Sequence, residues 1–383
     1  MADATKIEWT DATWNPITGC SVVSPGCTNC YAMKLAGTRL QHHPSRAGLT
    51  RETKAGPVWN GTVRFNEEWL TQPLAWKRPR MIFVCAHGDL FHEDVPDEWI
   101  DKVFAVMALA PQHTFQVLTK RAERMRAYMI EQWQGTPART ISLGRGETLH
   151  VPAGGPTGRR LKVEEACEPL LERFGLADTS KDHLWTGGGS CKAMQWQWPL
   201  PNVWLGVSAE DQKRADERVP ELLSTPAAVR FVSAEPLLDM IDLHRLPYGD
   251  GEMNALKPAP WLEEIERWRG TSSDWEDDFL DWFDLHEMPT GGHMHPVLDW
   301  IIVGGENGPR PMQAEWAQSI RDQCAAAGTA FFFKQWGSHI PAGQTMANGK
   351  VWAPGCGTRL RATKGITGRL LDGVEHNAMP RAA

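Results

Sequence analysis

The chain has 383 residues, a net charge of −7 and a hydrophobic content of 42%, values typical of a globular protein with one large domain or two. It has no run of about 18 apolar residues, which excludes a membrane-spanning helix of the usual kind, and its first residues lack the basic and apolar regions of a secretory signal. We therefore expect a cytoplasmic protein with no membrane partner, in a compartment where thiols stay reduced.

Short apolar runs recur along the chain, and each is followed by polar residues. After a first strand expected before Cys20, these runs lie at residues 81–85, 114–118, 203–207, 229–232, 300–303 and 330–333. Continuous runs without alternation are typical of strands buried on both faces of a parallel sheet. Helical patterns fill residues 96–110, 210–223 and 313–327. The alternation predicts an α/β fold, namely a partial or full (β/α) TIM-like barrel of six to seven parallel strands.

Two stretches interrupt this alternation. Residues 132–201 are rich in glycine and polar residues, and residues 247–296 are acidic and rich in tryptophan. Because both lie between expected strands, we interpret them as insertions into one barrel domain of residues 1–340. Residues 341–383 are expected to form a C-terminal extension that packs on the barrel.

Three closely spaced cysteines near the N-terminus carry the strongest chemical signal. Six residues separate Cys20 from Cys27, and two separate Cys27 from Cys30. Three thiolates satisfy three irons of a [4Fe–4S] cluster and leave the fourth iron open, and an open metal position is typical of a catalytic site. We therefore expect these three cysteines to be metal ligands. The remaining cysteines are expected to be ordinary thiols: Cys85, Cys167, Cys191, Cys324 and Cys356.

Zinc is the alternative metal for this motif. A structural zinc site would need a fourth ligand, which His42 or His43 could supply. The motif lacks a second close cysteine pair, however, and a gap of six residues is long for a zinc knuckle. The spacing therefore favours an iron–sulfur cluster over zinc.

Polar residues with a shared pattern follow three of the expected strands. In α/β barrels the active site is built from the loops at the carboxyl ends of the strands. Small residues there let a ligand approach, and a glutamate can accept its hydrogen bonds. Ser208 and Glu210 follow one expected strand, Ser233 and Glu235 follow the next, and Glu306 follows a third. We expect these five residues to bind cofactor or substrate. For Glu210, capping of the following helix is the alternative.

Other polar residues follow the second and the last expected strands. His87, Asp89 and His92 follow the second strand; a metal site is one reading, but contact with a ligand at the barrel mouth is favoured, so Asp89 is expected to bind cofactor or substrate. Lys334 belongs to the last of these segments. It could hold a carboxylate or phosphate group, or form a surface salt bridge.

The cysteine motif and its surroundings resemble a known family. Residues 14–20 (WNPITGC) and 24–32 (SPGCTNCYA) are similar to the phage-associated three-cysteine-motif family, whose members are found in phages and bacteria. Further matches follow in order at residues 73–77, 88–92, 118–121, 205–208, 233–238, 304–306, 333–337 and 368–373. That family in turn resembles a divergent branch of the radical S-adenosylmethionine (radical SAM) superfamily, although here six residues rather than three separate the first two cysteines.

The resemblance implies a [4Fe–4S] cluster and S-adenosyl-L-methionine as cofactors, with an external electron donor as a partner. The open iron would bind adenosylmethionine, and its cleavage would release a 5′-deoxyadenosyl radical that abstracts hydrogen from a substrate, so as to modify or repair it. A nucleic-acid base or nucleotide is the expected substrate, on the phage association and the basic residues Lys120, Arg121 and Arg124. A protein or peptide is the alternative substrate. A non-catalytic binding module stabilised by zinc or an iron–sulfur cluster is the alternative function.

Overall fold

The structure is a computed structural model of the chain, and it describes residues 5, 7–130, 139–144, 147–151, 159–174, 198–248, 251–257, 297–353 and 359–380. The chain divides into two compact units. The first holds residues 1–208 and 225–229, and the second holds residues 209–224 and 230–382. The cysteine motif therefore belongs to the first unit, whereas Glu210, Glu235 and Glu306 belong to the second.

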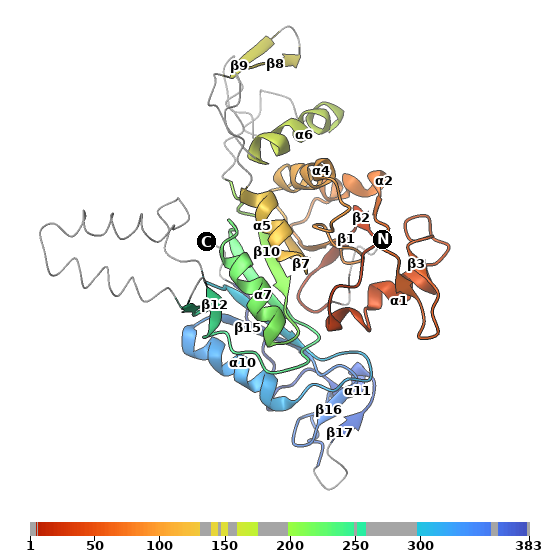
Figure 1. The fold of residues 1–383 in the computed structure, drawn as a ribbon, viewed down its shortest axis with the longest axis vertical. Coiled ribbons are helices and arrows are strands. Elements are labelled where there is room, and N and C mark those ends of the chain that lie inside the picture. The colour runs from red at the N-terminus through yellow and green to blue at the C-terminus, as the bar shows by residue number, and fades with distance from the viewer. Residues whose placement is uncertain are drawn as a thin grey trace, which may run out of the picture. The chain divides into compact units, whose positions relative to one another are not determined.

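Seven parallel strands form the main sheet, in the order β1-β6-β7-β10-β11-β14-β15 (Figure 1). They are β1 (Ala12–Trp14), β6 (Met81–Val84), β7 (Thr114–Thr119), β10 (Val203–Ser208), β11 (Val229–Ala234), β14 (Trp300–Gly304) and β15 (Ala330–Gln335). No described strand joins β1 to β15, so the sheet is open at both ends. The predicted α/β fold with six to seven parallel strands is thus confirmed in its partial form.

The strands are buried as the apolar runs predict. Every residue of β10 and every residue of β14 is buried, so side chains on both faces of these strands are covered. Such strands need no alternation of apolar and polar residues. In the first unit β1 pairs with β6, β6 with β7 and β7 with β10, all in parallel register. Their carboxyl ends therefore lie at one edge.

The three predicted helices are present, with slightly later starts. They are α4 (Asp97–Ala108), α7 (Gln212–Leu223) and α10 (Ala314–Ala327), and the first unit adds α5 (Ala122–Ile130) after β7. On α4 the buried residues Ile100, Val103, Phe104 and Met107 follow the spacing of one helix face. None of the helices in the described ranges is both long and apolar enough to cross a bilayer.

The segment between β1 and β6 folds into short elements around the cysteines. They are β2 (Ile17–Thr18), η1 (Pro25–Cys27, a 3-10 turn), α1 (Tyr31–Gly37), β3 (Thr50–Arg51), β4 (Val58–Trp59), β5 (Arg64–Phe65), α2 (Glu67–Leu70) and α3 (Gln72–Ala75). Strand β2 pairs with β5, and β3 pairs with β4, both antiparallel.

The two expected insertions lie only partly within the described residues. The first contains the hairpin β8 (Arg139–Gly144) and β9 (Glu147–Val151) and the helix α6 (Arg159–Phe174). The second begins with the hairpin β12 (Leu246–Tyr248) and β13 (Gly251–Met253), and its residues 258–296 lie outside the described part. The domain boundaries inferred from the sequence therefore stay a prediction.

The C-terminal residues contact the last strands of the second unit. Elements here are β16 (His339–Pro341), β17 (Arg359–Arg361) and α11 (Lys364–Thr367). The N–H of Phe333 on β15 donates to the carbonyl of His376 at 2.9 Å, and the indole N–H of Trp300 on β14 donates to the carbonyl of Ala378 at 2.9 Å. Residues 376–378 thus cover the open side of β15.

Candidate functional site

The cysteine loop begins at the carboxyl end of β1 and is tied to the loop after β6. The backbone N–H of Gly19 donates to the carbonyl of His87 at 3.1 Å, and Gly19 forms a parallel bridge with Gly88. Cys20 follows directly. Since β1 and β6 are parallel neighbours, this tie holds Cys20 at the carboxyl edge of the sheet, where α/β proteins build their sites.

Local turns position the other two cysteines. Cys27 ends the turn η1, and its sulfur lies 3.7 Å from the hydroxyl of Ser24. The N–H of Cys30 donates to the carbonyl of Cys27 at 3.1 Å, and Cys30 is the N-cap residue of α1. The CxxC spacing therefore forms a turn that leads straight into the helix.

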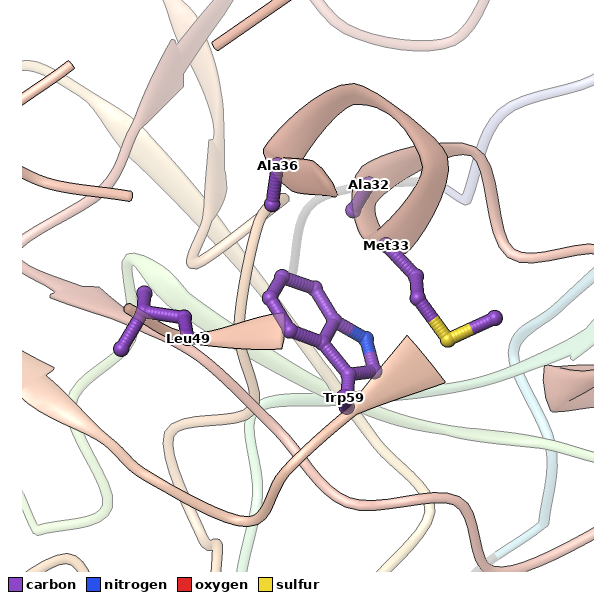
Figure 2. Close-up of a cluster of buried hydrophobic side chains, with 5 residues drawn as sticks. All are labelled: Ala32, Met33, Ala36, Leu49 and Trp59. Atoms are coloured by element: carbon purple, nitrogen blue, oxygen red, sulfur yellow. The ribbon is translucent and has the colours of Figure 1, made fainter. Parts of the chain in front are cut away.

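A small hydrophobic cluster lies beneath the motif (Figure 2). It consists of Ala32, Met33, Ala36, Leu49 and Trp59, and both Cys20 and Cys30 pack against it. The charge of an ionised Cys27 would act on both of these thiols. Cys20 and Cys30 thus share one hydrophobic support.

Burial disfavours the thiolate forms of Cys20 and Cys30. It raises the pKa of Cys20 to about 12, with the Asp89 carboxylate adding to the rise and Arg121 opposing it. Burial likewise raises the pKa of Cys30. No three His, Cys, Asp or Glu side chains in the described ranges form a ready-made metal group. Metal binding would therefore have to draw the sulfurs together and displace their protons.

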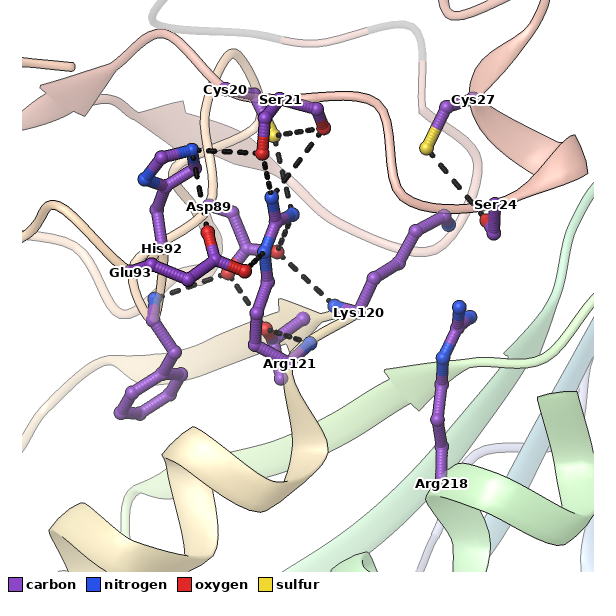
Figure 3. A network of polar contacts seen from close by, with 12 residues as sticks. Cys20, Ser21, Ser24, Cys27, Asp89, His92, Glu93, Lys120, Arg121 and Arg218 are labelled. Carbon is purple, nitrogen blue, oxygen red and sulfur yellow. Dashed lines mark hydrogen bonds and ion pairs between the residues drawn. The ribbon is translucent and has the colours of Figure 1, made fainter. Parts of the chain in front are cut away.

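A buried arginine reaches the cysteine loop from the end of β7 (Figure 3). The Nη1 atom of Arg121 donates to the Cys20 sulfur at 3.4 Å and to the Asp89 carboxylate at 3.1 Å. Its Nη2 atom donates to the Ser21 hydroxyl at 2.6 Å, and its Nε atom to the Glu93 carboxylate at 3.1 Å. Burial disfavours the charge of Arg121, but the Asp89 carboxylate and the hydrogen-bonded Glu93 carboxylate outweigh it and raise the pKa of Arg121.

The Asp89 carboxylate is fully used by this network. One oxygen accepts from the N–H of Phe91 at 3.1 Å and from the hydroxyl of Thr119 at 2.7 Å. The other accepts from the N–H of Lys120 and from Arg121, each at 3.1 Å. These four donors join the loop after β6 to the end of β7. The contacts give Asp89 a positioning role, and its predicted binding of a cofactor stays a prediction.

The two histidines expected near Asp89 point to different partners. His92 is buried, and its Nε2 atom lies 3.0 Å from the Ser21 hydroxyl. The Nδ1 atom of His87 instead accepts from Arg46 at 3.3 Å. The structure therefore does not bring His87, Asp89 and His92 together around a metal.

Each predicted glutamate of the second unit has a cationic partner. Glu210 lies 3.1 Å from Arg218, Glu235 lies 2.7 Å from Lys334, and Glu306 pairs with Arg310. Lys334 was expected to hold a ligand or to form a surface salt bridge. The structure shows it in an ion pair with Glu235, and this pair is largely buried. The small residues have a packing reason as well, because a Cβ on Gly304 would lie 3.2 Å from the Glu235 carboxyl carbon.

Helix capping is not the role of Glu210. The helix α7 is capped by Asp211, whose carboxylate accepts the N–H of Arg214 at 2.9 Å. Ser208 ends β10 and Ser233 lies within β11, and both are buried. None of these contacts tests whether the serines or glutamates bind a cofactor, so that part stays a prediction.

Sequence reasoning missed the role of the arginines. Arg121 and Arg124 were expected near a nucleic acid, but Arg121 is paired with Asp89 and Arg124 with Asp97. The only signal in the sequence was the position of Arg121 directly after a strand. Arg218 and Arg46 gave no signal, because their partners are set by the tertiary structure.

Gly19 allows the approach that ties the loop in place. Its φ is +97°, and a Cβ there would lie 2.1 Å from the carbonyl oxygen of Thr62. We expect Gly19→Ala to lower the free energy of unfolding by about 2–5 kcal/mol, through backbone strain and overpacking. Gly48→Ala is the matched control, since Gly48 has φ +77° and open space around its Cβ position. Urea unfolding measures both, and equal losses would contradict the close approach as the cause.

Comparison with known proteins identifies a family for the chain. No curated protein and no solved structure matches the chain. A family model described as "Protein of unknown function (DUF5131)" matches residues 4–380. The match includes the cysteine loop, the Arg121 network and the paired glutamates alike. With nearly its whole length matched, the chain belongs to the DUF5131 family.

Proposed function

We propose that Cys20, Cys27 and Cys30 ligate three irons of a [4Fe–4S] cluster, and that the protein is an enzyme of the radical SAM type. The observation that carries the proposal is that Cys20 and Cys30 pack on one hydrophobic cluster near the carboxyl edge of β1 and β6, with Cys27 close enough for its charge to act on both. An active site at this edge is usual for α/β folds. Three thiols without a fourth are the donor set that leaves one iron open.

The chemistry of the donor set fits iron better than zinc. His43, one of the two candidates for a fourth zinc ligand, has its Nδ1 atom 2.8 Å from the Ser45 hydroxyl. Three sulfur ligands alone would leave zinc short of its usual four.

The protein's own residues would tune the sulfur ligands. Arg121 donates to the Cys20 sulfur and so stabilises the thiolate that a metal requires. The hydrophobic cluster under Cys20 and Cys30 keeps water from that side of the loop. When bound, the cluster would supply the electron that cleaves adenosylmethionine to a 5′-deoxyadenosyl radical and methionine. The electron would come from an external donor.

The proposed substrate remains a nucleic-acid base or nucleotide. Of the three basic residues on which this substrate was inferred, two are already paired with carboxylates: Arg121 with Asp89 and Arg124 with Asp97. Lys120 is the residue of that group on which electrostatic attraction of a phosphate would depend. A salt-sensitive shift with DNA or RNA would favour this substrate over a protein or peptide.

An anaerobic assay tests the enzymatic proposal. The full chain is reconstituted with iron and sulfide, supplied with adenosylmethionine and dithionite, and analysed for 5′-deoxyadenosine. We expect 5′-deoxyadenosine with the wild type and with Cys324→Ala, whose thiol is buried on α10 in the second unit. Its absence from a protein that holds the cluster refutes adenosylmethionine cleavage. A colourless protein with one zinc per chain would instead support the non-catalytic binding module.

A further inference from the structure

Arg46 is a buried arginine without a carboxylate partner in the described part of the chain. Its side chain is only 5% exposed. Its Nε atom donates to the Nδ1 atom of His87 at 3.3 Å, and its Nη1 atom donates to the carbonyl and hydroxyl oxygens of Ser45. Its Nη2 atom makes no hydrogen bond with the described residues. Each hydrogen-bond partner is neutral, and the only other contact with the charge is the Trp69 ring, whose centroid lies 5.8 Å from the guanidinium carbon, so no anion among the described residues compensates it.

Burial of such a charge is unfavourable. Burial lowers the pKa of Arg46 to about 10, and the positive charge of Arg64 lowers it further. The opposing groups are Tyr31 and Cys85, which are neutral at pH 7. An uncompensated buried guanidinium costs several kcal/mol unless an anion reaches it. The charge of Arg121, the other buried arginine near the loop, is compensated by the Asp89 carboxylate.

His87 holds the Arg46 side chain in place and adds no charge to it. Because its Nδ1 atom accepts the Arg46 proton, the ring carries its own proton on Nε2. Burial and the charge of Arg46 lower the pKa of His87 to about 4, so the ring is neutral at pH 7. The ring contacts Tyr31 edge-on at 5.8 Å, and Tyr31, the residue after Cys30, is 50% exposed.

Arg64 makes the surroundings more positive. It donates to the backbone carbonyls of Pro44 and Ala47, which flank Arg46, and no carboxylate in the described ranges pairs with it. Two guanidinium groups thus lie near residues 44–47. Groups of this kind bind carboxylate and phosphate oxygens in proteins.

We propose that the guanidinium groups of Arg46 and Arg64 bind the oxyanion of a small-molecule ligand, either a carboxylate or a phosphate group, beside the cysteine loop. The site needs no metal and stands whether or not the three cysteines bind a cluster. It would hold the anionic end of a ligand on the same side of the first unit as Tyr31 and Cys30.

Thermal unfolding of the full-length, metal-free chain tests the site. The midpoint is measured against increasing potassium phosphate, potassium acetate and potassium chloride at equal ionic strength. We expect phosphate or acetate to raise the midpoint saturably, by about 2 °C or more above chloride, and the anion that does so identifies the ligand chemistry. The proposal is overturned if neither anion exceeds chloride.

Variants assign the effect to Arg46. Arg46→Met should weaken binding of the anion about a hundredfold, as expected for a lost hydrogen bond to a charged group. Arg321→Met is the control, because Arg321 is already paired with Asp372 in the second unit. If Arg46→Met does not fold, Arg46→Lys keeps the charge without the planar fork, and weaker binding by this variant is expected. Equal loss in the Arg321 and Arg46 variants would overturn the assignment.

Discussion

Replacement of Cys20, Cys27 and Cys30 together by alanine is expected to abolish iron and sulfide binding. The wild type should reach about four irons and four sulfides per chain after anaerobic reconstitution, as a [4Fe–4S] cluster requires. In the triple variant the loop keeps its backbone ties, because these involve Gly19 and the carbonyl of Cys27 and not the sulfurs. Chemical analysis of iron and sulfide, with absorption near 400 nm, measures the loss.

Two further variants sharpen this test. Cys324→Ala should keep the full cluster, because Cys324 is buried on α10 in the second unit. Each single replacement in the motif should leave clearly less than the wild-type iron, since a cluster held by two cysteines is readily lost. A triple variant that still holds the wild-type amount of iron would show that other residues bind it, and the proposed function would fall with it.

Loss of the Arg121–Asp89 pair is expected to lower the stability of the first unit strongly. Arg121→Met leaves the buried Asp89 charge with only three donors, and removal of one partner of a buried ion pair costs about 3–5 kcal/mol. Asp89→Asn should be similarly harmful, because the NH2 group of the amide would then face another donor, the Lys120 N–H or Arg121. Equilibrium urea unfolding, before any metal is added, measures both.

Arg124→Met serves as the matched control. Arg124 lies on the adjacent helix α5 and pairs with Asp97, but both side chains are about one-third exposed. Pairs this exposed contribute about 0–1 kcal/mol. If Arg121→Met is no more harmful than Arg124→Met, the buried network is not what holds the loop after β6 to the end of β7.

The fold followed from the sequence to the extent that it depends on local patterns. Continuous apolar runs gave strands such as β10 and β14 because burial on both faces removes any alternation. The last predicted helix ended where expected because Gly328 adopts a left-handed φ of +74°. Residues 258–296 lie outside the described part, so their interpretation as an insertion stays a prediction.

The candidate site was less predictable because charges find partners far along the chain. The pairing of Glu306 with Arg310 spans four residues and could have been read from the sequence. The pairing of Glu235 with Lys334 spans 99 residues, and that of Cys20 with Arg121 spans 101, so neither leaves a local trace. Carboxylates interpreted as ligand-binding groups therefore turned out to have partners of their own.

The span between Cys20 and Arg121 also bears on how the protein matures during synthesis. Cys20, Cys27 and Cys30 leave the ribosome early. Asp89 and Arg121 lie 69 and 101 residues after Cys20, so they follow much later. Until then the thiols are in an unfinished loop, open to oxidation and to whichever metal is most abundant. Correct loading of a nascent chain would therefore have to wait until roughly a third of it has been translated.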